Sequence, residues 1–180
     1  MKDKYSIFVN TSDGFEDCWE LFFHLFSRHW PNCDIKIYLN TEYKDYKFKN
    51  LNIIATKVAR NANKKLTWGE CLIKGIAQVQ TPIVFYLQED YFIDKPVNVS
   101  RINEFVDILI DRKNIQSIRL YERQKKADYI NTHIHGLLEI NKKSSYLVST
   151  QACLWKVKDV LRYIKPEYSG WMFELLGTIE

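Results

Sequence analysis

An apolar run that ends in two carboxylates constrains this chain more than any other feature. Residues 83–87 read Ile-Val-Phe-Tyr-Leu, which is typical of a buried strand, and Gln88, Glu89 and Asp90 follow directly. Burying an unpaired carboxylate is costly, so packing alone does not explain the two acids. Ligands of open α/β sheets bind outside the carboxyl ends of the strands, and carboxylates bind hard divalent cations. The run therefore predicts a metal-bridged phosphate site.

The order of strand and helix patterns predicts an α/β fold. Apolar runs at 6–10, 35–39, 52–56, 83–88 and 116–121 predict strands. Helical spacing is clearest in the aromatic series Trp19, Phe22, Phe23 and Phe26, and a capping box is formed by Thr67 and Glu70. A further helix is expected to begin at Ser100. Alternating strands and helices favour a parallel sheet that is covered on both faces.

The last third of the chain is predicted to be mainly antiparallel. Strands are expected at 137–140 and 146–157, with helices from Lys158 to Ile164 and after Gly170. The polar segment 123–136 is interpreted as a surface loop. The whole chain is thus expected to form one α/β domain with a mixed, mostly parallel central sheet, since 180 residues suit a single domain.

Composition and charge narrow the classes of partner and compartment. The net charge of +4 comes without a long basic block, so no nucleic-acid partner is expected. The N-terminus lacks a signal-peptide pattern, and no apolar run approaches the about 20 residues of a membrane span. The four cysteines form no CxxC pair and are expected to be free thiols. A cytoplasmic location is therefore expected, with peripheral association at the inner face of the membrane left open.

Phosphate binding by a glycine-rich loop is not encoded in this chain. Neither G-x-x-x-x-G-K-[ST] nor G-x-G-x-x-G occurs, and the sequence has six glycines in all. A bound diphosphate would need another counter-charge, which a carboxylate-held metal ion supplies. The lack of such loops strengthens the metal interpretation of Glu89 and Asp90.

The sequence Tyr-Leu-Gln-Glu-Asp-Tyr-Phe at 86–92 resembles the D-x-D-type motif of GT-A glycosyltransferases, which follows a central strand. More of the chain is similar to bacterial members found with surface-polysaccharide genes. The similar segments are Thr-Ser-Asp at 11–13, Trp-Glu-Leu-Phe-Phe-His-Leu-Phe at 19–26, His-Trp-Pro-Asn-Cys-Asp at 29–34, Ile-Tyr-Leu-Asn at 37–40, Trp-Gly-Glu-Cys-Leu at 68–72, Thr-Pro at 81–82 and Trp-Met-Phe-Glu at 171–174. The resemblance implies a GT-A-like fold, and the chain is short for it, so we expect one domain over 1–180 that is shortened at its C-terminal end.

The resemblance also implies roles for the strand ends. Asp90 would bind the divalent metal, Mn²⁺ or Mg²⁺, on the donor diphosphate, and Glu89 would assist it or contact the ribose. Gln88 stands where a strict D-x-D has its first acid and would hydrogen-bond the ribose. The loop at Asn10, Thr11 and Asp13 would hold the nucleobase and ribose. Two structural readings remain open: a loop anchor for Asp90, and an ordinary turn residue for Asp13.

Glu174 is the candidate general base. A carboxylate within hydrogen-bond reach of an acceptor hydroxyl removes its proton, and burial beside Phe173 would raise its pKa toward a useful range. The alternative is a carboxylate that is favoured by the helix dipole. The other candidate substrate contacts are Trp68, Gln151, Trp155 and Trp171. The pair His133 and His135, as metal ligands, and Arg60, as a phosphate ligand, are weaker options.

These residues lead to a glycosyltransferase as the expected function, with inversion of configuration. It would move a sugar from a nucleotide-diphosphate donor to a saccharide or lipid-linked saccharide acceptor in polysaccharide or lipopolysaccharide assembly. Two alternatives stay open. One is a non-catalytic module that binds nucleotide sugars or carbohydrates, and the other is a sugar-phosphate nucleotidyltransferase. The latter usually carries a basic, glycine-rich loop after its first strand, where this chain has Thr-Ser-Asp-Gly.

Overall fold

The computed structural model describes residues 3–121 and 128–179, which fold around a six-stranded sheet. The strands lie in the order β3 (Ile53–Ala55), β2 (Ile37–Asn40), β1 (Tyr5–Asn10), β4 (Ile83–Gln88), β8 (Cys153–Lys156) and β5 (Ser117–Arg119). The first four strands of this order pair in parallel, whereas β8 runs antiparallel to both of its neighbours. The predicted α/β class with a mixed, mostly parallel sheet is confirmed.

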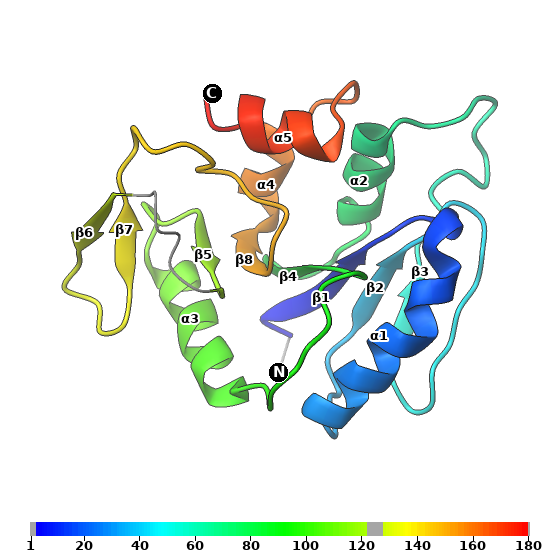
Figure 1. Cartoon of the computed structure of the whole chain (residues 1–180), viewed down its shortest axis with the longest axis horizontal. Coiled ribbons are helices and arrows are strands. Elements are labelled where there is room, and N and C mark those ends of the chain that lie inside the picture. The colour runs from blue at the N-terminus through cyan, green and yellow to red at the C-terminus, as the bar shows by residue number, and fades with distance from the viewer. Residues whose placement is uncertain (1–2, 122–127, 180) are drawn as a thin grey trace.

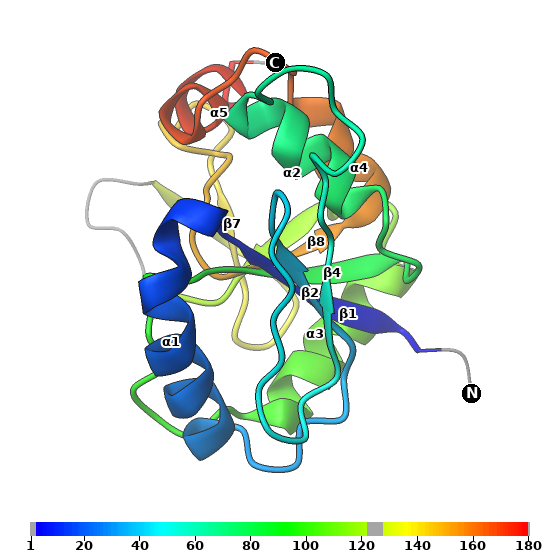
Figure 2. The ribbon, with the colours of Figure 1, turned by 90° about the vertical axis from the view of Figure 1, so that its right-hand side faces the viewer.

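Helices cover both faces of the sheet and give three layers (Figures 1 and 2). One face carries α1 (Glu16–His29) and α3 (Val99–Asp111), and the other carries α2 (Trp68–Ile76), α4 (Val157–Tyr163) and α5 (Gly170–Leu176). A short 3-10 helix, η1 (Asp13–Phe15), leads from β1 into α1. A hairpin of β6 (Tyr129–Asn131) and β7 (Leu138–Ile140) lies to the side of α3 and β5 (Figure 1).

Two hydrophobic cores follow from the alternation of side chains along the central strands. On β4, Phe85 and Leu87 join the core beneath α1 and α3, while Val84 and Tyr86 join the core beneath α2, α4 and α5. The first core is rich in aromatic rings, because α1 buries the predicted series Trp19, Phe22, Phe23 and Phe26. Both faces are buried, which is why β1 and β4 read as continuous apolar runs.

Several predicted elements need correction. The third helix begins at Val99 rather than after Ser100, because the Asn98 side chain accepts a hydrogen bond from the Arg101 N–H at 3.0 Å. The strand predicted over 146–157 is confined to Cys153–Lys156. The preceding residues form a loop whose polar groups bind α5 instead of a neighbouring strand.

The segment 123–136 is not simply the loop that we expected. Residues 122–127 lie outside the described part of the chain, but Tyr129–Asn131 form β6 and pair antiparallel with β7. Tyr129 and Ile130 are residue types that favour strands, and the polar composition of the surrounding segment hid this signal.

The predicted capping box and the expected free thiols are found in the structure, whereas the strand predicted over 116–121 is confined to Ser117–Arg119. Thr67 Oγ1 accepts from the Glu70 N–H at 3.1 Å, and Glu70 Oε2 accepts from the Thr67 N–H at 2.9 Å, so the capping box is present. The four cysteines are free thiols. Among the described residues, no helix combines the length and apolarity needed to cross a membrane.

The start of α2 packs closely against the α4–α5 connection through Gly69. Its N–H donates to the Tyr168 carbonyl at 2.9 Å, and a Cβ at this position would overlap the carbonyl oxygens of Lys165 and Pro166. Helix propensity alone would favour alanine at a helical position. An alanine at position 69 would therefore stabilise the fold if helix propensity decided the outcome, and destabilise it if the close contact between α2 and this connection does.

We expect Gly69→Ala to lower the free energy of unfolding by about 1–3 kcal/mol, the usual cost of overpacking. Gly14→Ala is the matched control, since a Cβ there meets only Ser12 Oγ at 3.5 Å. Its effect should stay within about 0.5 kcal/mol. Urea unfolding measures both variants, and a Gly69→Ala protein as stable as the parent would contradict the close contact.

Candidate active site

The candidate site lies at the carboxyl edge of the sheet, where β1 and β4 end side by side. Their register pairs Asn10 with Gln88. The chain leaves β1 toward β2 and leaves β4 toward β5, so the strand order reverses between these two strands. Such reversal points are where ligands bind in open α/β sheets. Because β8 is antiparallel, the loop that enters it reaches the same edge.

A row of hydrogen-bonded polar side chains lines this edge on the α2 side. Asn40 Nδ2 donates to Asn10 Oδ1 at 3.0 Å, and Thr56 Oγ1 donates to Asn40 Oδ1 at 3.1 Å; all three residues are buried. The row crosses the ends of β1, β2 and the residue after β3. It therefore holds Asn10 in a fixed orientation.

Glu89 is a buried carboxylate at the end of β4. Only 7% of the residue is exposed. Burial raises the pKa of Glu89 from the usual 4.5 to about 7, and the charge of Asp90 adds to the rise. The Thr11 side chain, in the loop after β1, opposes it. Thr11 is itself held by Trp19, whose Nε1 donates to its hydroxyl at 2.9 Å.

Asp90 is exposed to solvent, unlike its neighbour Glu89. Both carboxylates lie near Cys18 on α1, because burial and then the charges of Asp17, Glu89 and Asp90 raise the pKa of this thiol. The pair thus combines one accessible and one buried acid. This pair fits a hard divalent cation that one or two carboxylates share with substrate phosphates.

Three or more metal-ligating side chains do not cluster anywhere in the described residues. A magnesium or manganese ion at Glu89 and Asp90 would take its remaining ligands from substrate and water, which is usual for Mg²⁺. His133 and His135, which we considered as metal ligands, do not lie on a strand. They lie in the exposed β6–β7 turn, where the His135 carbonyl accepts from Arg101.

Glu174 projects from α5 onto the loop before β8. Its Oε1 accepts three hydrogen bonds, from Thr150 N–H at 2.7 Å, Thr150 Oγ1 at 2.9 Å and Ser149 Oγ at 3.2 Å. Oε2 has no hydrogen-bond partner within the described segments. One oxygen therefore fixes the carboxylate, and the other remains available to a ligand.

Two tyrosines of the β4 segment connect Glu174 with the acid pair. The pKa of Tyr91 is raised by burial and then by the charges of Asp90 and Glu174, while Gln151 lies beside its hydroxyl and opposes the rise. The pKa of Tyr86 is raised by burial and then by Glu89 and Glu174. The charges of the acid pair and of Glu174 thus both affect the hydroxyl groups of Tyr86 and Tyr91.

The Tyr86 hydroxyl is buried, and no hydrogen bond of good geometry satisfies it within the described residues. Gln88 and Asn10 lie close enough to lower its pKa. Tyr121 presents a second such hydroxyl, near Ser149 and Glu174. Buried polar groups without partners are rare in native proteins, so these two mark a place for water or a polar ligand.

Asp13 has a structural role at the rim. Its two carboxylate oxygens accept from the N–H groups of Glu42, Tyr43 and Lys44 at 3.0, 3.0 and 3.2 Å. Glu42 Oε2 in turn accepts from the Asp13 N–H at 2.6 Å. The contacts join the loops after β1 and β2, so Asp13 anchors a second loop, which differs from an ordinary turn residue.

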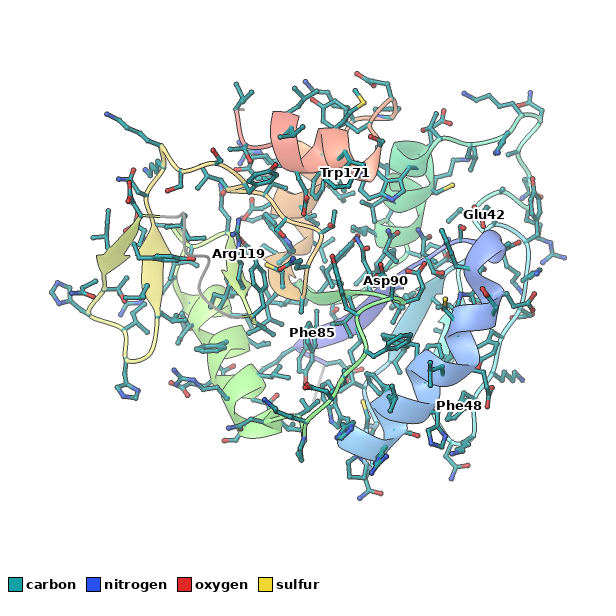
Figure 3. All side chains as sticks on the ribbon, viewed as in Figure 1. Glu42, Phe48, Phe85, Asp90, Arg119 and Trp171 are labelled. Carbon is teal, nitrogen blue, oxygen red and sulfur yellow. The ribbon has the colours of Figure 1, made fainter. Side chains whose placement is uncertain are left out.

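Figure 3 shows how the site lies between its neighbours. Asp90 occupies the middle of the view, with Trp171 above it on α5, Glu42 to one side and Arg119 to the other. Trp171 is 76% exposed and lies one helical turn before Glu174. Arg119 at the end of β5 is held by the Tyr146 carbonyl.

Other predicted contacts lie away from this edge. Trp155 is 3% exposed and packs against Tyr163 in the core beneath α4, so it is a core residue. Trp68 packs on Phe173 at 5.8 Å between ring centroids and joins α2 to α5. Arg60 lines a depression of about 520 Å³ between β3 and α2, together with Lys57 and Lys74. This depression has no acid in its lining, and it shares Thr56 with the polar row that crosses the strand ends.

Sequence reasoning missed Tyr91, Tyr86, Ser149, Thr150 and Arg119. Tyr91 carried a usable signal, because it directly follows the acid pair. Ser149 and Thr150 were hidden by the prediction of a strand over 146–157. A polar Ser-Thr pair before a buried strand is a signal for a loop that binds a neighbouring side chain.

The raised pKa of Glu89 predicts a pH-dependent stability. Below about pH 4.5 the carboxyl is neutral in both states; between there and about pH 7 it ionises only when unfolded, so the fold loses stability as pH rises. We expect Glu89→Gln to be more stable than the parent by up to about 3 kcal/mol at pH 8, and equal to it at pH 4. Urea unfolding in chelator checks this, with exposed Asp94→Asn as control; a pH-independent difference would contradict the assignment.

No family model matches the chain, and no curated protein or solved structure matches it either.

Proposed function

We propose that the chain is a GT-A-type glycosyltransferase that moves a sugar from a nucleotide-diphosphate donor to a saccharide or lipid-linked saccharide acceptor. Assembly of a surface polysaccharide or lipopolysaccharide is the expected setting. The single observation that supports the proposal is that the Glu89–Asp90 pair follows β4 at the edge reached by the loop before β8, to which Glu174 is hydrogen-bonded. The arrangement offers one acidic end for a donor diphosphate and one for an acceptor hydroxyl.

The donor side would use the ends of β1 and β4. Asn10 is fixed by Asn40, and Gln88 pairs with it in register, so both offer amide groups to a nucleoside. Thr11 borders the same edge. A divalent cation held by Asp90 and Glu89 would neutralise the charge that develops on the leaving diphosphate.

The acceptor side would use Glu174. Its Oε2 takes the proton of the acceptor hydroxyl as the oxygen attacks the anomeric carbon, and the bond to the diphosphate breaks with its electron pair on the phosphate oxygen. Attack from the face opposite the leaving group inverts the configuration. Hydrogen bonds from Thr150 and Ser149 to Oε1 keep the base oriented during this step. Gln151, which lies beside the Tyr91 hydroxyl, would contact the acceptor sugar, and the exposed Trp171 is the second candidate contact.

A non-catalytic nucleotide-sugar module is the second candidate, because of one observation. The three hydrogen bonds on Glu174 Oε1 also suit a carboxylate that simply anchors the loop before β8. In that case donor binding would persist without turnover. The two functions therefore differ in the outcome of substitutions at Glu174.

The metal assignment predicts that nucleotide binding depends on Asp90. A thermal-shift screen of nucleotide sugars with and without Mn²⁺ should find a ligand that stabilises the protein by about 2.7 kcal/mol at 100 times its Kd. Asp90→Asn should lose the manganese-dependent part of this shift, whereas Asp94→Asn, an exposed acid of the same loop, should keep it. An unchanged shift in Asp90→Asn would contradict the site.

The base assignment predicts that Glu174→Gln lowers kcat about 10²–10⁴-fold, the usual contribution of general base catalysis. The amide oxygen still accepts from Thr150 and Ser149, so the fold and the donor KM should change little. Glu167→Gln, an exposed acid in the loop before α5, is the control. Donor turnover with the best nucleotide sugar measures the effect, and full activity in Glu174→Gln would assign Glu174 to loop anchoring.

A further inference from the structure

The outward face of α5 is apolar along its whole length. Five large apolar side chains occupy it, and each of them is more than a third exposed. Their exposed fractions are 76% for Trp171, 37% for Met172, 49% for Leu175, 38% for Leu176 and 80% for Ile179 in the turn that follows. At 100° per residue these positions span one continuous arc of the helix. A contiguous exposed apolar patch of this kind marks an interaction surface.

The opposite face of α5 is fixed to the domain, so the helix does not turn this arc inward. Phe173 is buried against Trp68, and Glu174 is bound by Ser149 and Thr150. Thr178 Oγ1 accepts from the Val148 N–H at 3.3 Å and closes the same contact one turn later. These contacts hold the apolar arc on the outer side of α5.

Lysines lie on both sides of the arc. The loops at 60–66 and 141–147 rise to the same end of the molecule as α5, and Figures 1 and 2 share this vertical direction. Each loop carries an exposed lysine pair, Lys64-Lys65 and Lys142-Lys143. Among the described residues, the acids around α5 include Glu70, which is bonded to Lys64 at 2.8 Å, the exposed Glu167, and Glu174, which Ser149 and Thr150 hold on the inner side of the helix. The exposed Lys65, Lys142 and Lys143 are therefore the charges that lie beside the outer, apolar side.

The apolar arc and the lysines beside it together indicate which kind of partner binds this surface. A two-fold contact between copies of the chain would bring like charges of the lysine pairs toward one another. An anionic bilayer instead attracts the lysines electrostatically, while Trp, Leu and Ile side chains enter the headgroup–acyl boundary. We propose that α5 is a membrane-docking surface that binds the domain peripherally to an anionic lipid bilayer.

The inference goes beyond the proposed function, since binding to lipid is expected with or without glycosyl transfer. It has one consequence for the site. Glu174 lies on α5, so docking would place the acceptor end of the site close to the lipid surface. A lipid-linked acceptor would then reach Glu174 without leaving the bilayer.

Co-sedimentation with phosphatidylcholine vesicles, with and without phosphatidylglycerol, tests the proposal. We expect the parent protein to bind the anionic vesicles and to dissociate as salt is raised. The double variant Leu175→Gln/Ile179→Gln should bind about tenfold more weakly. Lys142→Gln/Lys143→Gln should reduce the preference for phosphatidylglycerol.

The matched control is Leu21→Gln/Tyr43→Gln, which removes two exposed apolar residues on other surfaces and should bind as the parent does. Urea unfolding checks that all variants remain folded. Failure of the parent to bind anionic vesicles at low salt would overturn the proposal, as would equal binding by Leu175→Gln/Ile179→Gln. A concentration-dependent dimer that this variant loses, seen by sedimentation equilibrium without vesicle binding, would assign the face to a second copy.

Discussion

The parallel pairing of β1 with β4 is the constraint on which the rest of the structure depends. Six residue pairs fix the register of the two strands, so that Asn10 and Gln88 end level with each other. Every group of the candidate site is then positioned relative to these two ends. The connections that leave the two strands lead to opposite edges of the sheet, from β1 to β2 and from β4 to β5. A shift of one residue would turn Tyr86 and Gln88 into the other core and disperse the site.

The rim around the strand ends is stabilised by side chains that bond to backbone. Asp13 joins the loops after β1 and β2, and Glu174 joins α5 to the loop before β8. These anchors use acids, as the candidate chemistry does. An acid whose carboxylate oxygens are all hydrogen-bonded suits an anchoring role, whereas an acid with an unbonded oxygen could also act on a substrate. Asp13 has both oxygens occupied, whereas Glu174 has one that is free among the described residues.

The strands and helices of the core were predictable from sequence because burial leaves a clear pattern. The apolar run at 83–87 and the aromatic series on α1 need no long-range information. The loop before β8 could not be predicted in the same way, since Val148, Ser149 and Thr150 have the composition of a strand. Their hydrogen bonds go to α5, about 25 residues later in the chain, and a local pattern does not contain that partner. The start of α3 was placed at the wrong residue because Asn98 and Ser100 are both good N-cap residues.

The candidate site was predictable residue by residue but not as an arrangement. Asp90 and Glu174 stood out by type and position, and Tyr91 directly follows the acid pair, but only the tertiary fold brings Tyr91 near Glu174 as well. Trp155 illustrates the converse: its residue type suits sugar stacking, but its place in the register of β8 buries it. The reversed direction of β8 has a consequence for how this fold could diversify. The loop entering an antiparallel strand reaches the site as closely as those leaving the parallel strands. Insertions within 141–152 would therefore remodel one wall of the site while leaving the strand framework unchanged.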